Sequence, residues 1–205
     1  MNTMRAHRRP AEGFTIVELM VVIAIIAVVL ALAVPSYKSV TTQGRMAGEI
    51  NDLATSIELA RSAAIKQGLT VTICPSANPT ATPSTTAPAC ANSTEWNTGW
   101  VVFIDTAGNQ TFTTSGDTLL RTHGPFTGSD TLVYSSTAGT STGITFNRMG
   151  GTTSFGGTTT NFGNTGTLTL HDSTNNATWR RCVILSEAGN ITVDSEQNGL
   201  QGACP

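Results

Sequence analysis

The hydrophobic and polar positions of this 205-residue chain form three successive patterns. A run of 16 apolar residues, 19–34 (LMVVIAIIAVVLALAV), follows a short basic segment, 1–13. Phe14 to Pro35 is 22 residues, about 33 Å of helix, which matches the ~30 Å hydrocarbon core of a bilayer. The first pattern therefore predicts one membrane-spanning helix over 14–35, with its Arg-rich side in the cytoplasm and the chain after Pro35 outside.

After Pro35 the apolar residues recur at steps of three and four, which is the spacing of an amphipathic helix. The stripe consists of Ile50, Leu53, Ala54, Ile57, Ala60 and Ala64. We expect this helix to occupy 36–68, to end near Gln67 and to use Gly68 as its C-terminal stop. Pro35 is expected to kink this helix, and Gly44 is expected to weaken it.

The third pattern, over 69–205, alternates short β-prone segments with turns rich in Gly, Ser, Thr and Asn. The strongest strand is 99–105, and 69–74 alternates as a half-buried strand should. Weaker strands are predicted at 118–121, 131–135, 143–146, 166–170, 181–186 and 190–193, with loops at 75–94 and around 150–166. The sequence thus predicts an α+β fold, a long N-terminal helix with a membrane-spanning half and an amphipathic half, packed against an antiparallel β-sheet domain.

An ordinary secretory signal is an alternative interpretation of the N-terminus. Such a signal has a shorter apolar core, and its small-residue cleavage site follows that core. Here the small residue, Gly13, precedes the apolar run, and Glu18 lies at the run's N-terminal edge. A permanent membrane anchor is a second alternative, which N-terminal processing would distinguish.

Charge excludes one broad class of partner. The formal net charge is −2. Loss of 1–13 would remove three Arg and one Glu, leaving 8 basic and 12 acidic residues and a charge of −4. A mildly acidic protein has no general attraction for nucleic acid or anionic lipid.

The four cysteines are Cys74, Cys90, Cys182 and Cys204. They lack the closely spaced pairs typical of zinc sites. In an exported domain, the oxidising compartment would convert them to two disulfides. Three pairings are possible. We favour the two local ones, Cys74–Cys90 and Cys182–Cys204; four free thiols would require a reducing compartment.

No sequence feature supports an enzyme, a metal site or a cofactor. The three histidines are isolated, and no nucleophile-elbow, zinc-protease or phosphate-loop string occurs. We interpret Asp105, Asp117 and Asp130 as structural turn or strand-end acids. The aromatic residues Trp96, Trp100 and Phe103 are predicted to be core rather than a ligand-stacking surface.

The string over 13–26, GFTIVELMVVIAII, together with Pro35, resembles the signature of type IV pilins and type II secretion pseudopilins. The resemblance implies that a prepilin peptidase cuts between Gly13 and Phe14 and methylates the new N-terminus. It also implies a single-pass protein of the bacterial inner membrane, with a periplasmic globular domain, that later enters a filament. The expected partners are other minor and major pilins, through the N-terminal helices, and the inner-membrane assembly machinery.

Segments 59–68, 71–74 and 96–105 resemble the GspH/FimT/FimU group. This implies a structural subunit present in few copies, which helps to initiate or cap a type IV pilus. The alternatives are a GspH-like minor pseudopilin of type II secretion and a FimT-type DNA-uptake receptor.

Glu18 is the candidate assembly residue. A carboxylate costs on the order of 3 kcal/mol at the bilayer centre and less near its edge. The amine that cleavage creates at Phe14, on the same or a neighbouring subunit, could compensate this charge and favour one axial stagger between helices. Alternatively, Glu18 is simply a first-turn helix acid at the headgroup level.

DNA binding is predicted to be negligible. The resemblance places that activity on a Gly-Arg-x-Arg loop, and the matching residues here are Gly189-Asn190-Ile191-Thr192. Both Arg are missing, and Asp194 and Glu196 follow, which would repel phosphate. The pair Arg180-Arg181 is the only basic pair after residue 13.

Overall fold

The computed structural model describes residues 13–81, 88–136, 142–154, 165–196 and 204. It contains one long helix, α1 (Ile16–Gln67). The chain divides into two compact units, residues 1–41 and 42–205, and α1 contributes to both. All but the last residue of the predicted leader, 1–13, lie outside the described part.

The first unit is an exposed helix. Every residue from 13 to 38 is solvent-exposed. The apolar part of α1 is long and apolar enough to cross a membrane, by length and composition alone. The helix continues through Pro35, although proline cannot donate the backbone hydrogen bond to the preceding turn.

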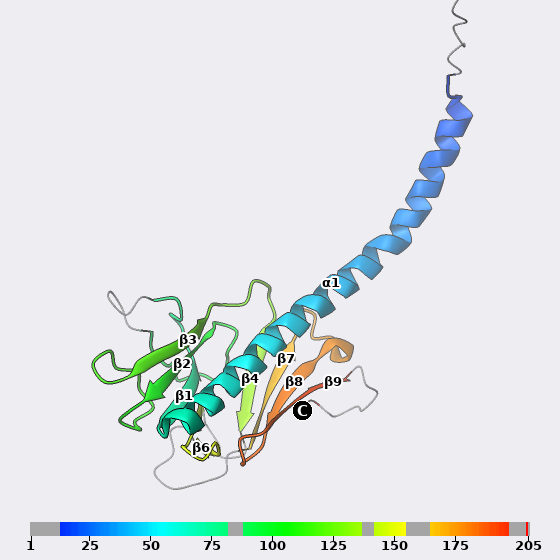
Figure 1. Ribbon diagram of the computed structural model, residues 1–205. Helices are drawn as coiled ribbons and strands as arrows, with labels where there is room; N and C mark the ends of the chain where they lie inside the picture. The colour runs from blue at the N-terminus through cyan, green and yellow to red at the C-terminus, as the bar shows by residue number, and fades with distance from the viewer. Residues whose placement is uncertain (1–12, 82–87, 137–141, 155–164, 197–203, 205) are drawn as a thin grey trace, which may run out of the picture. The chain divides into compact units, whose positions relative to one another are not determined.

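The second unit holds two antiparallel sheets (Figure 1). The five-stranded sheet has the order β3-β2-β1-β5-β6, and the four-stranded sheet has the order β4-β7-β8-β9. Their bounds are β1 (Thr70–Pro75), β2 (Trp100–Asp105), β3 (Thr118–His123), β4 (Thr131–Ser136), β5 (Ile144–Phe146), β6 (Thr152–Ser154), β7 (Gly166–His171), β8 (Arg181–Leu185) and β9 (Ile191–Ser195). A 3₁₀ turn, η1 (Ala177–Trp179), precedes β8.

One strand contradicts the sequence analysis, which expected a loop around 150–166. β6 pairs with β5, with Phe146 opposite Thr152. The turn between them depends on Asn147, whose side-chain oxygen accepts the amides of Met149 at 2.8 Å and Gly151 at 3.1 Å. This side-chain turn closes the hairpin in a segment that looks like a simple Gly-rich loop.

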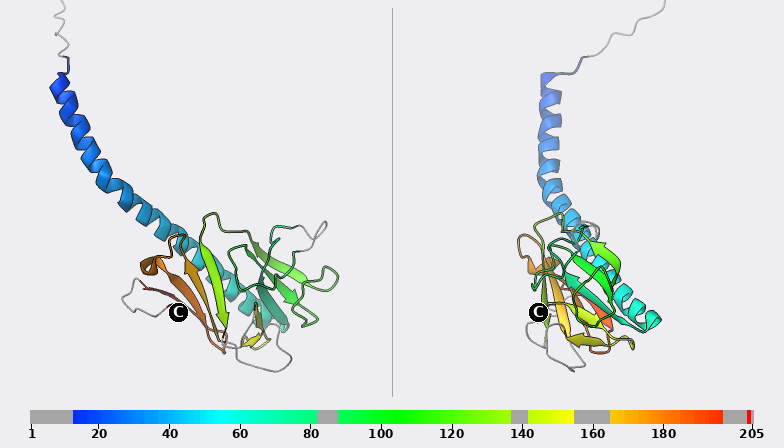
Figure 2. Two further views of the ribbon diagram at one scale, coloured as in Figure 1. Left: turned by 180° about the vertical axis from the view of Figure 1, so that it is seen from behind. Right: turned by 90° about the vertical axis from the view of Figure 1, so that its left-hand side faces the viewer.

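Within this unit the second half of α1 packs against the inner faces of both sheets (Figures 1 and 2). One hydrophobic core combines residues of the helix, the five-stranded sheet and the four-stranded sheet. The helix contributes Met46, Ile50, Leu53, Ile57, Ala60, Ala63 and Ala64. The predicted stripe is therefore nearly complete; Ala54 is only partly buried, and Met46 and Ala63 extend it. The prediction of an α+β fold is confirmed.

Strand β1 differs from the prediction for 69–74, and its neighbour β2 is buried in the same way. That segment was expected to be buried on one face only, but five of the six residues of β1 and all six of β2 are buried. A second cluster covers their outer face and consists of Cys74, Val101, Phe103 and Phe112, with Cys90 and Leu119 packed against it. The loops before and after β2 supply this cover, which strand periodicity cannot indicate.

Candidate functional site

The predicted cleavage junction lies immediately before the first turn of α1. Gly13 and Phe14 precede the helix, Phe14 is 80% exposed, and a Cβ placed on Gly13 would meet nothing within 4 Å. Thr15 caps the helix, because its hydroxyl accepts the Glu18 amide at 3.2 Å and its carbonyl accepts the Leu19 amide at 3.1 Å. The junction is thus an accessible, non-helical segment joined to a defined helix start.

Thr15 is a functional residue that the sequence analysis missed. Its spacing to Glu18 is that of a capping box, a Ser or Thr followed three residues later by Glu or Gln. That signal was available in the sequence. It explains why the helix begins at Ile16, two residues after Phe14, the residue that the peptidase would expose.

Glu18 is solvent-exposed in the first turn of the helix. No ion pair joins it to any residue that the structure describes. A carboxylate at this position is favoured by the helix dipole in water. In a lipid or packed-helix environment it needs a cation, and that cation has to come from the Phe14 amine or from another molecule.

The cysteines form two disulfides, Cys74–Cys90 and Cys182–Cys204, with S–S distances of 1.98 and 2.12 Å. These are the local pairings that the sequence analysis favoured. The first lies in the outer cluster over β1 and β2. The second joins Cys204 to β8, and both of its cysteines are buried.

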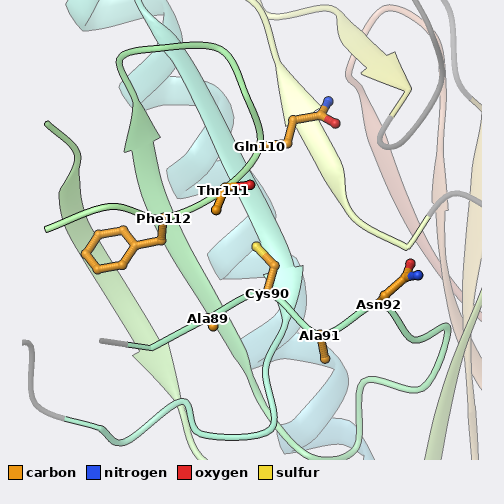
Figure 3. A pocket seen from close by; sticks show the side chains of 7 residues that line it. All are labelled: Ala89, Cys90, Ala91, Asn92, Gln110, Thr111 and Phe112. Carbon is orange, nitrogen blue, oxygen red and sulfur yellow. The ribbon is translucent and has the colours of Figure 1, made fainter. Parts of the chain in front are cut away.

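The aromatic residues are core, as predicted. Trp96, Trp100 and Phe103 are fully buried. A small cavity of about 170 Å³ lies beside the outer cluster and is lined by Ala89, Cys90, Ala91, Asn92, Gln110, Thr111 and Phe112 (Figure 3). Ligand pockets usually occupy roughly 300–1,000 Å³, so this cavity is small for a substrate.

The acids and the remaining histidines have structural contacts. Buried Asp105 accepts the amides of Asn109 at 3.0 Å and Gln110 at 2.6 Å. Burial opposes ionisation of Asp117, but hydrogen bonds from Thr113 and Thr106 outweigh it and lower its pKa. His123 stacks on Trp100 with ring centroids 3.9 Å apart, and His171 bonds to Asn175 at 2.8 Å.

Arg61 is a second residue whose role the sequence did not reveal. It extends from α1 and donates to the Gly150 carbonyl and the Ala188 carbonyl, at 3.2 Å each. It thereby fixes the β5–β6 turn and the β8–β9 turn. Gly189, in the latter turn, has a φ of +78°, and a Cβ there would lie 1.9 Å from the Gly150 oxygen.

The segment aligned with the DNA-binding loop is this same β8–β9 turn. Asn190 and Thr192 are exposed, and Asp194 and Ser195 lie further along β9. Of the neighbouring basic pair, Arg180 forms an ion pair with Glu196 at 3.4 Å. The turn itself therefore contains no arginine, the guanidinium of Arg61 from α1 is bonded to its Ala188 carbonyl, and acids flank it.

Two family models match the chain. The family described as type II transport protein GspH matches residues 49–189, and the prokaryotic N-terminal methylation motif matches residues 8–34. The first match covers more than two thirds of the chain. The chain belongs to the GspH family. It is a type IV pilin or pseudopilin of the GspH type, whose N-terminal motif implies processing by a prepilin peptidase and assembly with other pilin-family subunits.

The GspH-family chain is also similar to two crystal structures of the type IV minor pilin FimU from Pseudomonas aeruginosa. Sequence identities are 18% and 19%, TM-scores are 0.44 and 0.42, and the alignments cover 74% and 73% of this chain and 92% of each FimU chain. The family assignment rests on the two family models. The family is a structural one, and its apolar N-terminal helix is consistent with membrane anchoring and incorporation into a filament.

Proposed function

We propose that this protein is a minor type IV pilin, inserted in few copies into a pilus, where it helps to initiate or cap assembly. The observation that carries the proposal is the first half of α1, an apolar helix exposed along its whole length, with a single acid, Glu18, in its first turn. Such a surface requires a membrane or other helices around it. The second unit, residues 42–205, which we call the head, remains in the periplasm while the subunit is anchored in the inner membrane.

Maturation at Gly13 and Phe14 is the first testable part of the proposal. Intact-mass analysis and N-terminal sequencing of the protein from membranes should give a chain that starts at methylated Phe14. A Gly13→Val variant should keep its leader, because the bulkier side chain replaces the small residue before the cut. Any other mature start would contradict the proposal.

Glu18 is the second part. We infer that its carboxylate pairs with the Phe14 amine of a neighbouring subunit, because in a dry helix bundle an unpaired carboxylate is costly and only one stagger pairs it. Glu18→Ala should reduce recruitment into sheared filaments at least about tenfold. The matched control is Glu58→Ala, which removes an exposed acid from the second half of the same helix. Equal recruitment of both variants would remove the assembly role.

A minor pseudopilin of type II secretion is a second candidate, favoured by the description of the matching family model. Both candidates have the same N-terminal helix and the same processing by a prepilin peptidase. They differ in the assembly that they enter, a type IV pilus or a type II secretion system. In a strain that lacks this chain, loss of surface pili with normal secretion of exoproteins would support the pilin. Loss of secretion with normal piliation would support the pseudopilin instead.

DNA uptake is the third candidate, and the β8–β9 turn disfavours it. We expect no mobility shift of duplex DNA at micromolar protein and physiological salt, because the turn lacks arginine and is flanked by acids. A salt-sensitive shift would contradict this expectation and favour a receptor role.

A further inference from the structure

The region where α1 begins to pack on the head contains a partly buried charge cluster, in which the two acids are buried and Arg45 is partly exposed. Arg45 donates twice to Asp130, from Nε to Oδ2 at 2.8 Å and from Nη2 to Oδ1 at 2.7 Å. Asp130 lies in the loop before β4 and is 2% exposed. Glu49, one helical turn after Arg45, is 9% exposed, and its Oε1 is 3.9 Å from the Arg45 Nε. The Arg45–Asp130 pair joins segments that are 85 positions apart in the chain.

The cluster has more carboxylates than cations. Asp130 takes both aligned guanidinium donors, so Glu49 has only the longer contact, and its Oε2 has no partner among the described residues. The two carboxylates therefore share a single guanidinium, and the cluster of Arg45, Glu49 and Asp130 has one more acid than base.

The surrounding charges do not relieve this excess. Asp172, just after β7, is buried and adds a third carboxylate that acts on Arg45. Burial, and after it the neighbouring Asp130, raise the pKa of Glu49 to about 7, because the charge of Arg45 offsets only part of their effect. Protonation of Glu49 thus removes a buried negative charge that has no cation of its own.

The adjoining helix depends on such contacts for its stability. Residues 42–49 include Gly44 and Gly48, and a Cβ at either position would meet nothing within 4 Å. Neither glycine is therefore required by close packing, and each weakens a helix by about 1 kcal/mol relative to Ala. Attachment to the head has to offset this local weakness.

We propose that Arg45, Glu49 and Asp130 form an acid-strengthened clasp that holds residues 42–49 of α1 on the head. A carboxyl whose pKa is raised in the folded state contributes stability that is fully present below its unfolded value of 4.5 and is lost as pH rises through about 7. The attachment of residues 42–49 to the head is therefore more stable at mildly acidic pH and less stable at neutral to alkaline pH. This behaviour is independent of whether the subunit serves a pilus or a secretion system.

The test is amide hydrogen exchange of residues 42–49 in the full-length chain, purified in a non-ionic detergent and corrected for intrinsic exchange. Between about pH 5 and pH 8, the opening constant of the wild type should rise at least about tenfold. In Glu49→Gln, which mimics the protonated acid, the rise should be less than about threefold. A smaller rise in the wild type, or the full rise in Glu49→Gln, would overturn the proposal.

Two further measurements keep the test decisive. Asp52 is an exposed acid of the same helix that lies 3.6 Å from His123, so Asp52→Asn is the control and should keep the wild-type rise. If Glu49→Gln does not fold, the side-chain carboxyl of Glu49 can be titrated in the wild type by carbon-13 NMR. A midpoint above about pH 5.5 supports the clasp, and a lower midpoint overturns it.

Discussion

The two halves of α1 obtain their stability from different sources. Residues 13–38 are exposed and almost uniformly apolar, whereas nine residues between Met46 and Ala64 are buried against the sheets. The second half is a component of the head's core. Among the residues that the structure describes, none buries the first half, so a bilayer or neighbouring helices would have to cover its apolar surface. One continuous helix therefore joins a folded domain to a surface that is incomplete without other molecules.

Matched truncations in the two halves should give the largest difference. Ile57 is fully buried, so Ile57→Ala should reduce the free energy of unfolding of the head by about 2–5 kcal/mol. Ile25 is exposed, and Ile25→Ala should leave that free energy unchanged while weakening incorporation into filaments. Chemical denaturation in detergent, followed by tryptophan fluorescence, measures the first effect. Equal destabilisation by both variants would contradict the comparison.

Removal of the disulfide on the outer face of the five-stranded sheet should have the next largest effect. Cys74→Ser combined with Cys90→Ser opens a loop of 16 residues' separation, and we expect a loss of about 2–4 kcal/mol in head stability. Membrane insertion of the first half of α1 should not change. Denaturation midpoints of the wild type and the double variant, both measured without reductant, test this, because reductant would also open the Cys182–Cys204 disulfide.

The ion pair that attaches the helix to the loop before β4 should contribute less. Arg45→Met leaves Asp130 buried without its cation, which we expect to cost about 1–3 kcal/mol. The control in the exposed half is Lys38→Met, which should change head stability by no more than about 0.5 kcal/mol. If the head of the Arg45→Met variant were as stable as that of the Lys38→Met variant, Asp130 would have to find another partner.

The smallest predicted effect is at the helix start. Thr15→Val removes the hydroxyl that accepts the Glu18 amide, which should weaken the first turn by about 1 kcal/mol. Faster amide exchange at Glu18, with unchanged exchange at buried Leu53, would show that the effect is local. Slower or unchanged exchange at Glu18 would exclude Thr15 as the cap.

The sequence predicted those parts of the fold that depend on local pattern. The apolar span, the stripe at Ile50, Leu53 and Ile57, and eight of the nine strands all follow from periodicity and turn residues. The missed strand, β6, depends on the Asn147 side chain, which closes a turn that composition alone marks as a loop.

The missed contacts are those between distant segments. Arg45 and Asp130 are 85 positions apart, and Arg61 meets the carbonyls of Gly150 and Ala188, 89 and 127 positions away. No periodicity links such residues, since their proximity depends on the packed arrangement of helix and sheets. At the candidate assembly site the signal was local, so Gly13, Phe14 and Glu18 could be nominated from sequence, whereas the Thr15 cap was present in the same string and went unused.

The β8–β9 turn, in which Gly189 is buried and its neighbours are exposed, determines which new surface residues this head could accept. Gly189 itself tolerates no side chain, because the Gly150 carbonyl occupies the space of a Cβ. Asn190 and Thr192 point to solvent and are open to replacement. Grafting arginine at these two positions would rebuild a Gly-Arg-x-Arg string on an intact scaffold, and it would show whether the surrounding acids alone are enough to keep nucleic acid away.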